Sequence, residues 1–383
     1  MVDGHRILLW VSDSYAHGRD ILSGALRFAR RRANWTIQRR PGARRLPDRA
    51  ALRRADGIIA FINSPEGVAA FRRTRAPLVN VAASLPRSPW PVVANDDAAI
   101  GQLAAEHFLE RGYRSFAYVA LRGDFAPALE EGFARRLAAE NLTFRRLTYG
   151  SAREASRPGP FRPRPHLLRW VVDLPPQTAV LAVVDTVAVA VIGACKEMGR
   201  AVPDDIAVLG VNNDELACEA VDPTLSSIET AGEQIGYRAA MLLADLMAGA
   251  PLPASPVWVP PLGVIVRAST GATAIADPVV SAALAFVRHN VSHPTSVSDV
   301  LESLLVSRKS LERKFRQHLG RTPLVEIRRV HLQHAQQLLI HTDYPMNDVA
   351  RRSGFARPQH MATLFHRLVG TTPTAYRQQF RNR

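Results

Sequence analysis

Cysteine, lysine and long apolar segments are scarce in this sequence of 383 residues. Its two cysteines, Cys195 and Cys218, lie in separate apolar stretches without a Cys-x-x-Cys spacing, which excludes a disulfide framework and favours buried thiols in a reducing compartment. The apolar run at residues 6–11 has the length of a strand and is too short for a signal peptide or a membrane span. We therefore expect a cytoplasmic protein with no membrane partner.

Motifs that carry enzyme chemistry are also absent from the sequence. It has no metal-ligand cluster, catalytic triad, phosphate-binding loop or dinucleotide fingerprint, so we expect neither an enzyme nor a cofactor, and no catalytic or metal-binding residues. His331 and His334 have helical spacing but no further ligands beside them. We interpret them as solvated helix residues rather than as a metal site.

Positive charge is unevenly distributed along the chain. The sequence holds 49 basic and 34 acidic residues, a formal charge of +15, and only three of the basic residues are lysines. A composition that simply favours arginine could produce such an excess. However, residues 277–383 hold 16 Arg and Lys against 7 Asp and Glu. This basic C-terminal segment favours a polyanionic partner such as nucleic acid.

Residues 6–265 alternate strand-like and helix-like patterns. Apolar runs of strand length occur at 7–11, 57–62, 77–81, 116–120, 179–184 and 206–211, and helix patterns lie between them, including 98–109 and 187–198. This order predicts parallel sheets with helices on both faces, and the length predicts two lobes. Thr230 and Glu233 have the spacing of a capping box before a further helix.

Small and polar residues fill positions 267–278, and the pattern after them is helical with no strand candidates. We therefore predict a two-lobed α/β domain over 1–266, a linker over 267–279 and an all-α domain over 280–383.

The helical segment contains an internal repeat. Phe315 is followed by Gly320 and Thr322-Pro323, and the same pattern returns fifty residues later as Phe365, Gly370 and Thr372-Pro373. Each copy follows a short amphipathic helix and a turn. Two such helix-turn-helix units joined by one helix predict a paired reader of double-stranded DNA.

The second helix of each unit combines an apolar stripe with an outer polar face. We expect Leu311, Phe315 and Leu319 to face inward in the first unit, and Met361, Leu364, Phe365 and Leu368 in the second. Arg and Lys side chains can read guanine in the major groove, and Glu can accept from cytosine. The predicted DNA-contacting residues are Ser307, Arg308, Lys309, Glu312, Arg313, Arg357, Gln359, His360, Thr363 and Arg367.

At these residues the C-terminal segment resembles the AraC/XylS family of bacterial regulators. The resemblance covers about residues 280–381 and is carried by Gly354-Phe355, Phe365, Gly370, Thr372-Pro373 and Tyr376-Arg377. The first unit departs from the family pattern. Leu301 replaces a small Ala, Leu305 replaces the Gly of the turn, and Glu326 replaces a Tyr.

The N-terminal segment resembles the sugar-binding domain of the LacI/periplasmic-binding-protein family. The matching residues include Asn95-Asp96-Asp97, the stretch 105–119, Asp185, the stretch 202–210 and Leu225-Ser-Ser-Ile228. A DNA reader placed after this domain is the arrangement of the bacterial xylose-operon activators. The resemblance implies a small-molecule effector held between two lobes at the carboxyl ends of strands.

Polar residues at strand ends are candidates for binding this effector, namely Asp13, Tyr15, Asn95, Asp96, Asp185, Asn212 and Asn213. The family resemblance adds Arg19 and Glu130 to these candidates. The family usually has Asp where Asn212 stands and commonly has Arg where Glu130 stands. A carboxylate only accepts hydrogen bonds, whereas an amide also donates.

Together these resemblances imply a transcription regulator, controlled by a monosaccharide such as the pentose D-xylose, that activates a sugar catabolic operon. They imply a homodimer, with RNA polymerase as a possible partner. Two alternatives stay open at this point: a non-sugar polar effector, and repression instead of activation.

Overall fold

The structure is a computed structural model that describes residues 4–32, 34–39, 49–85, 87–122, 126–151, 163–271, 274–275 and 277–380. The chain forms two compact units. The first comprises residues 1–107 and 114–272, and the second comprises 108–113 and 273–383. Each unit is described here by itself. No helix in the described ranges combines the length and the apolarity needed to cross a bilayer.

The first unit contains a parallel four-stranded sheet in the order β2-β1-β3-β4. Its strands are β1 (His5–Trp10), β2 (Trp35–Arg39), β3 (Gly57–Ala60) and β4 (Leu78–Asn80). A two-stranded sheet pairs β5 (Val93–Asn95) with β11 (Val257–Val259). Helices α1 (Ala16–Ala29), α2 (Arg49–Arg54), α3 (Pro65–Phe71) and α10 (Gly232–Met247) accompany these strands and form the first lobe with them.

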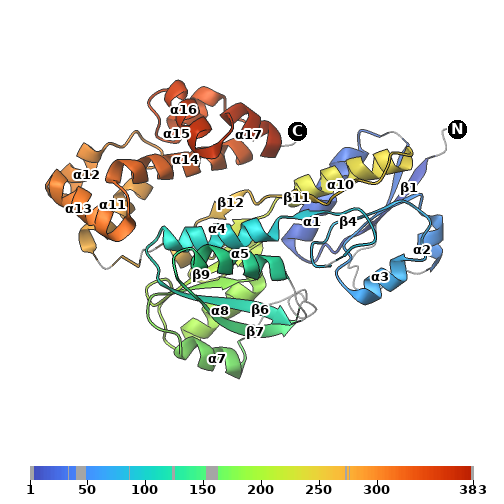
Figure 1. The fold of residues 1–383 in the computed structure, drawn as a ribbon, viewed down its shortest axis with the longest axis horizontal. Coiled ribbons are helices and arrows are strands. Elements are labelled where there is room, and N and C mark those ends of the chain that lie inside the picture. Colours follow the sequence, from blue (N-terminus) through green and yellow to red (C-terminus); the bar gives the residue numbers. More distant parts are fainter. Residues whose placement is uncertain are drawn as a thin grey trace. The chain divides into compact units, whose positions relative to one another are not determined.

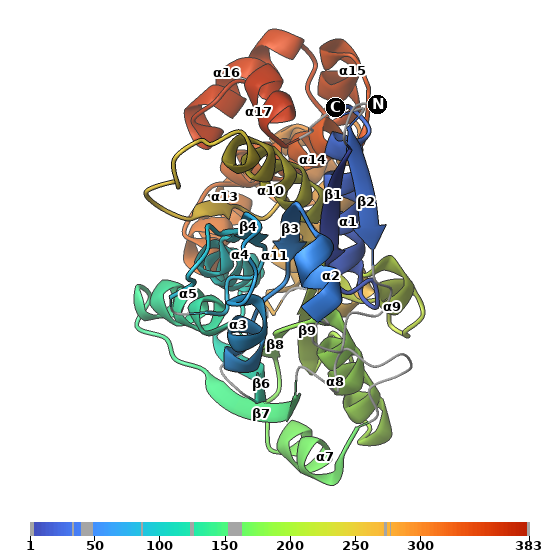
Figure 2. The same cartoon turned by 90° about the vertical axis from the view of Figure 1, so that its right-hand side faces the viewer.

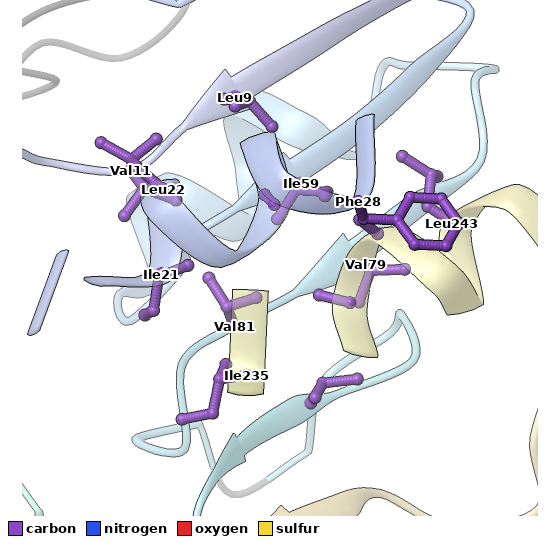
Figure 3. Close-up of a cluster of buried hydrophobic side chains, with 14 of the residues drawn as sticks. Leu9, Val11, Ile21, Leu22, Phe28, Ile59, Val79, Val81, Ile235 and Leu243 are labelled. Carbon is purple, nitrogen blue, oxygen red and sulfur yellow. The ribbon is translucent and has the colours of Figure 1, made fainter. Parts of the chain in front are cut away.

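Both faces of this sheet are buried, as its continuous apolar strands predict. Ile7 and Leu9 pack with α1 and α10, whereas Leu8 and Trp10 alternate to the face covered by α2 and α3. Figure 3 shows the first of these cores, where Leu9, Ile59 and Val79 of the strands meet the helices. The close packing of α1 on α10 depends on glycine, because a Cβ at Gly24 would overlap the Glu233 carbonyl oxygen.

A six-stranded sheet in the order β12-β10-β9-β8-β6-β7 forms the second lobe. Its strands are β6 (Ser115–Arg122), β7 (Arg145–Ser151), β8 (Thr178–Ala182), β9 (Ile206–Val211), β10 (Ser226–Glu229) and β12 (Gly263–Ile265). The sheet is parallel except that β12 runs antiparallel to β10. The accompanying helices are α4 (Asp97–Leu109), α5 (Pro127–Ala138), α7 (Pro165–Val172), α8 (Asp185–Glu197), α9 (Glu215–Glu219) and the 3-10 turn η1 (Ala268–Thr270).

The four-stranded and the six-stranded sheets of this unit are separate, with the blue and the green strands in different regions of Figures 1 and 2. The chain leaves the first lobe after Asn95, returns to it after Glu229, and crosses again after Val259. This organisation confirms the prediction of parallel sheets in two lobes. The short strands β2, β5, β7, β10, β11 and β12 were not predicted as such.

The structure differs from two local predictions, a capping box at Thr230 and a linker that begins at residue 267. The capping box at Thr230 is wrong, since α10 begins at Gly232 and the Thr230 hydroxyl bonds the ring of His17 instead. Within the segment expected to be a linker, Ser269 and Thr270 are buried, and the Ser269 hydroxyl accepts a hydrogen bond from the Ser226 amide at 2.8 Å.

The second unit is helical in its described part. Its helices are α11 (Pro278–His289), α12 (Val297–Leu304), α13 (Arg308–Leu319), α14 (Pro323–His341), α15 (Met346–Arg352), α16 (Pro358–Val369) and α17 (Pro373–Phe380). Helix α14 contacts the helices on either side of it in the sequence, so it is the common support of both helix-turn-helix units. The predicted all-α domain with two such units is confirmed.

Candidate functional site

The repeated Gly-x-Thr-Pro sequence is the stop and start signal between helices. Gly320 and Gly370 end α13 and α16 with φ of +67° and +79°, a conformation that glycine adopts without strain. Thr322 then caps α14 by accepting from the Val325 amide at 3.4 Å, and Pro323 occupies the first turn. Thr372 accepts from the Ala375 amide at 3.2 Å in the second copy. Each copy therefore fixes where a recognition helix ends.

The turn of the second helix-turn-helix unit packs on the central helix. A Cβ at Gly354, where φ is +77°, would lie 2.6 Å from the ring of His331 on α14. The same ring lies edge-on to Phe355 at 5.9 Å. His331 is thus buried, and the expectation that it is a solvated residue is wrong. Burial, followed by the charge of His334, lowers its pKa to about 4.

The first unit reaches the same geometry with a different residue. Leu305 ends α12 with φ of +51°, so a leucine adopts the left-handed conformation that glycine favours. Its side chain is 92% exposed, and no packing compensates for the strain. A capping box at the other end of α12, between Ser296 and Asp299, is complete.

The residues predicted to contact DNA lie on the outer faces of α13 and α16. All are exposed except Glu312, which is half-buried and pairs with Arg308 at 3.1 Å. Ser307 is also the N-cap of α13, accepting from the Ser310 amide at 3.3 Å. On α16, Gln359, Thr363 and Arg367 recur every fourth residue and share one face. The inward assignment of Leu368 is wrong, since its side chain is 57% exposed.

In the first unit a cavity of about 140 Å³ lies between residues of the two lobes. Its polar lining comes from both lobes and from the crossing segment after β5. The polar and acidic lining residues are Tyr15, His17, Asn63, Ser84, Asn95, Asp97, Asp185, Thr186, Asn212 and Asp214. This cavity is the candidate effector pocket.

Four of the nine predicted effector residues line this pocket: Tyr15, Asn95, Asp185 and Asn212. The other five lie outside the lining and have local partners. Asp13 pairs with Arg39, Arg19 with Asp214 at 3.2 Å, and Glu130 with Arg146 at 2.7 Å. Asp96 accepts from the Ala99 amide at 3.0 Å, and the Asn213 amide donates to Ser227 Oγ at 3.0 Å.

Asp185 holds the loop that follows β9. Its Oδ1 accepts from Ser227 Oγ at 2.5 Å, and its Oδ2 accepts from the Asp214 amide at 2.8 Å. Gly210 makes room for this carboxylate, because a Cβ there would overlap Asp185 Oδ1. Burial raises the pKa of Asp185 to about 7, although the two hydrogen bonds oppose the shift.

His17 joins two segments that cross between the lobes. Its Nδ1 lies 3.1 Å from Thr230 Oγ1, and its Nε2 lies 3.4 Å from Asn95 Nδ2. Burial lowers the pKa of His17 to about 4, so the ring is neutral at pH 7. His17 was not among the predicted effector residues, although its position in the first turn of the helix after β1 could have indicated it.

Asp214 connects the lobes on the rim of the pocket. Its Oδ2 accepts from the Ala16 amide at 3.1 Å, at the start of α1, and from Arg19 Nη2 at 3.2 Å. An anion at a helix N-terminus is stabilised by the free amides and the helix dipole. Arg19 therefore contributes to joining the lobes, although it does not line the cavity.

The lining of the pocket is suited to binding a polar ligand. Among the described residues, no group of three or more His, Cys, Asp or Glu side chains is placed to hold a metal ion. The polar lining offers amide, hydroxyl and carboxylate groups for hydrogen bonds, and Tyr15 and Phe61 supply aromatic surface beside them.

Comparison with known proteins agrees with the division of the chain into an α/β unit and a helical unit. Residues 105–270 match the model of a periplasmic binding protein-like domain, and residues 301–379 match that of a helix-turn-helix domain. The xylose operon regulatory protein of Escherichia coli K12 is 30% identical over 380 residues, which cover 97% of both chains. The protein of the same name from Haemophilus influenzae is 29% identical over 338 residues, covering 84% of both.

Solved structures give the same result for the fold. The structure of the xylose-binding transcription activator xylR covers 99% of both chains, with a TM-score of 0.61 and 27% identity. A LacI family transcriptional regulator from Enterococcus faecium with bound ribose covers 69% of this chain and 98% of its own. Its TM-score is 0.56 and its identity 19%, which shows a shared fold for the first unit.

Proposed function

The chain belongs to the family of the xylose operon regulatory proteins, and we propose that it activates a sugar catabolic operon in response to a sugar, most simply a pentose such as D-xylose. The observation that carries this function is the pair of recognition helices, α13 and α16, with exposed basic side chains, in a chain that also has a pocket lined by residues of both lobes. We place the protein in the cytoplasm, where a regulator meets its promoter.

Effector binding acts in the first unit. Tyr15, Asn95, Asp185 and Asn212 line the pocket, and we assign them, with His17, to hold the hydroxyls and the ring of the sugar. A ligand that contacts both lobes stabilises the closed form over the open one and so shifts the population of the two states.

DNA recognition acts in the second unit. We assign Lys309, Arg313, Gln359 and Thr363 to base edges in two successive stretches of major groove, since they lie on the outer faces of the two recognition helices. The remaining basic residues, including Arg308, Arg357 and Arg367, suit phosphate contacts. Two copies of the chain, binding as a homodimer beside RNA polymerase, complete the proposed activator.

A gel-shift titration on the DNA upstream of the protein's own gene tests this function. We expect sequence-specific binding that weakens steeply with salt, because phosphate contacts release counterions, and that changes on addition of D-xylose. Arg313→Ala should cost about 1–3 kcal/mol at one base position if Arg313 reads guanine. Arg351→Ala, which removes an equal charge from α15, should weaken all sequences alike. Absence of specific binding at any salt concentration would contradict the proposal.

A further inference from the structure

The effector pocket has an apolar corner that the polar strand ends do not predict. It is formed by Ile100 of α4, Leu121 at the end of β6, and Ala126 and Leu129 at the start of α5. Leu121 and Leu129 are each 2% exposed. A ligand that fills the cavity must therefore place one side against hydrocarbon.

The close packing of two helices fixes this corner. A Cβ at Gly101 of α4 would overlap the Leu129 carbonyl oxygen, and a Cβ at Gly132 of α5 would overlap that of Ala98. The first turn of α5 consequently presents Leu129 to the cavity. Its neighbour Glu130 lies outside the lining and pairs with Arg146 at 2.7 Å.

Carboxyl groups line the cavity, and burial raises the pKa of both Asp97 and Asp185 to about 7, so these two are only partly ionised at pH 7. Asp97, Asp185 and Asp214 line it, and no Arg or Lys does so among the residues that the structure describes. The nearby cations have acidic partners, since Arg19 pairs with Asp214 and Arg39 with Asp13. His17 is neutral at pH 7 because burial lowers its pKa to about 4.

The volume of the cavity suits a ligand with one ring. A cavity of about 150 Å³ with apolar walls is known to bind a single benzene molecule. The volume here is about 140 Å³, which is of the size that holds a single six-membered ring.

We propose that this pocket selects an uncharged monosaccharide ring that turns an edge without hydroxyls, a methylene or a methyl group, toward Leu121 and Leu129, and that it rejects sugar acids and sugar phosphates. The inference rests on the proposed function and narrows its effector class. An anionic sugar would bring its charge into a site that is lined by carboxyl groups and offers no cation among the described residues. A hydroxyl against the leucines would lose its hydrogen bonds to water without replacement.

Calorimetric titration of the full-length protein with matched sugars tests the proposal. The set is D-xylose, D-xylose 1-phosphate, D-glucuronate, D-glucose and 6-deoxy-D-glucose, all of which form a pyranose ring. We expect D-xylose to bind, and both anions to bind at least about 100-fold more weakly. We expect 6-deoxy-D-glucose to bind about tenfold or more tightly than D-glucose, because it lacks the hydroxyl that would meet the leucines.

The outcomes separate this inference from the proposed function. If D-xylose 1-phosphate binds as tightly as D-xylose, or D-glucuronate as tightly as D-glucose, the charge argument is overturned while the sugar-responsive regulator stands. If D-glucose binds as tightly as its 6-deoxy form, the apolar corner does not select against a hydroxyl group on the ligand. If no sugar of either kind binds, while specific DNA binding persists, the sugar effector itself is wrong and this inference fails with it.

Variants at neighbouring positions locate the effect. Leu129→Arg should raise the affinity for D-glucuronate relative to D-glucose by about tenfold or more, because it supplies the missing cation. Glu130→Gln should leave that ratio unchanged, since Glu130 faces Arg146. Leu129→Ala tests the corner without adding charge, and we expect it to reduce the preference for 6-deoxy-D-glucose over D-glucose. An unchanged preference in a folded Leu129→Ala protein would show that Leu129 does not contact the ligand.

Discussion

Glu326 and Arg329 form a buried ion pair on one face of α14, with 2.7 Å between Oε1 and Nη2. Glu326 is completely buried, and Arg321 pairs with its other oxygen at 2.6 Å. Arg329 also pairs with Glu110, which belongs to the segment 108–113 of the same compact unit. The glutamate that replaces the family's usual tyrosine therefore has two arginine partners, which explains how a charge is accommodated there.

Glu326→Ala should destabilise the helical unit by about 3–5 kcal/mol, because it leaves Arg329 and Arg321 without this carboxylate in a buried site. Glu312→Ala is the control, since it breaks an exposed pair with Arg308 that is worth about 0.3–0.5 kcal/mol. Hydrogen exchange of peptides from residues 297–341 would measure both. Equal effects of the two substitutions would show that burial does not increase the contribution of the Glu326 ion pair to stability.

Acid should weaken the same site. Burial alone would raise the pKa of Glu326, but the hydrogen bond and charge of Arg329, together with Arg321, lower it to about 2. A depressed pKa stabilises the fold above the unfolded value near 4.5 and loses this contribution as the pH falls from 4.5 toward 2. Glu326→Gln removes the titrating group. The variant should therefore lose less protection from hydrogen exchange than the wild type as the pH falls from 4.5 toward 2.

Leu305→Gly should stabilise the first helix-turn-helix unit by about 0.5–1 kcal/mol. The left-handed conformation costs a leucine about 1–2 kcal/mol, which glycine avoids. Glycine also loses more conformational entropy on folding than leucine does, and this offsets part of the stabilisation. The same change at Leu368, exposed but helical, should instead destabilise by up to about 1 kcal/mol. Hydrogen exchange in peptides spanning residues 297–319 and 358–370 would show whether each substitution stabilises or destabilises its own helix-turn-helix unit. A destabilised Leu305→Gly protein would indicate that the exposed leucine makes a stabilising contact.

The sequence predicted the elements whose signal is local. The Gly-x-Thr-Pro repeat specifies a helix end and a helix start within four residues, and the structure places Gly320 and Thr322 in those roles. The strands at 57–60 and 206–211 were predictable because both of their faces are buried, which makes every residue apolar. Strands at the edges lack that signal, because β2 has only exposed and half-buried residues and β7 combines exposed, half-buried and buried ones.

The pocket was only partly predictable, because strand ends locate polar residues but do not give their directions. Tyr15, Asn95, Asp185 and Asn212 line it, whereas Glu130 points to Arg146 and its neighbour Leu129 faces the cavity. That choice depends on how α5 packs against α4, a contact between segments about thirty residues apart. Likewise, Thr230 and Glu233 have the spacing of a capping box, but a tertiary partner, His17, binds the threonine.

His17 should make the first unit sensitive to acid. Its pKa is lowered by burial from 6.5 to about 4, so the unfolded chain takes up a proton at a pH where the folded chain does not. The associated stability is present above pH 6.5 and is lost as the pH falls toward 4, by about 2 kcal/mol between pH 7 and pH 5. Tryptophan fluorescence during urea unfolding reports this unit selectively, since all five tryptophans lie between residues 10 and 258.

His17→Gln should remove most of this pH dependence, because an amide can bond Thr230 and Asn95 without titrating. His5→Gln, at an exposed position at the start of β1, is the matched control and should leave it unchanged. If the His17→Gln protein loses stability with acid as steeply as the wild type, another group controls the acid response.

Asn212 tests whether the pocket is correctly assigned, because its backbone and its side chain predict opposite effects. The backbone has φ of +100°, which glycine adopts more readily, so Asn212→Gly should stabilise the first unit by about 1 kcal/mol. The side chain lines the cavity, and its removal should cost about 1–3 kcal/mol of effector binding if the amide bonds a sugar hydroxyl.

Asn213 is the control, since its φ is also positive at +49° but it does not line the cavity. Asn213→Gly should therefore leave effector affinity unchanged. Urea unfolding and calorimetry on the two variants would measure both quantities. If Asn212→Gly binds the sugar as tightly as the wild type, Asn212 serves only the turn after β9 and makes no hydrogen bond to the effector.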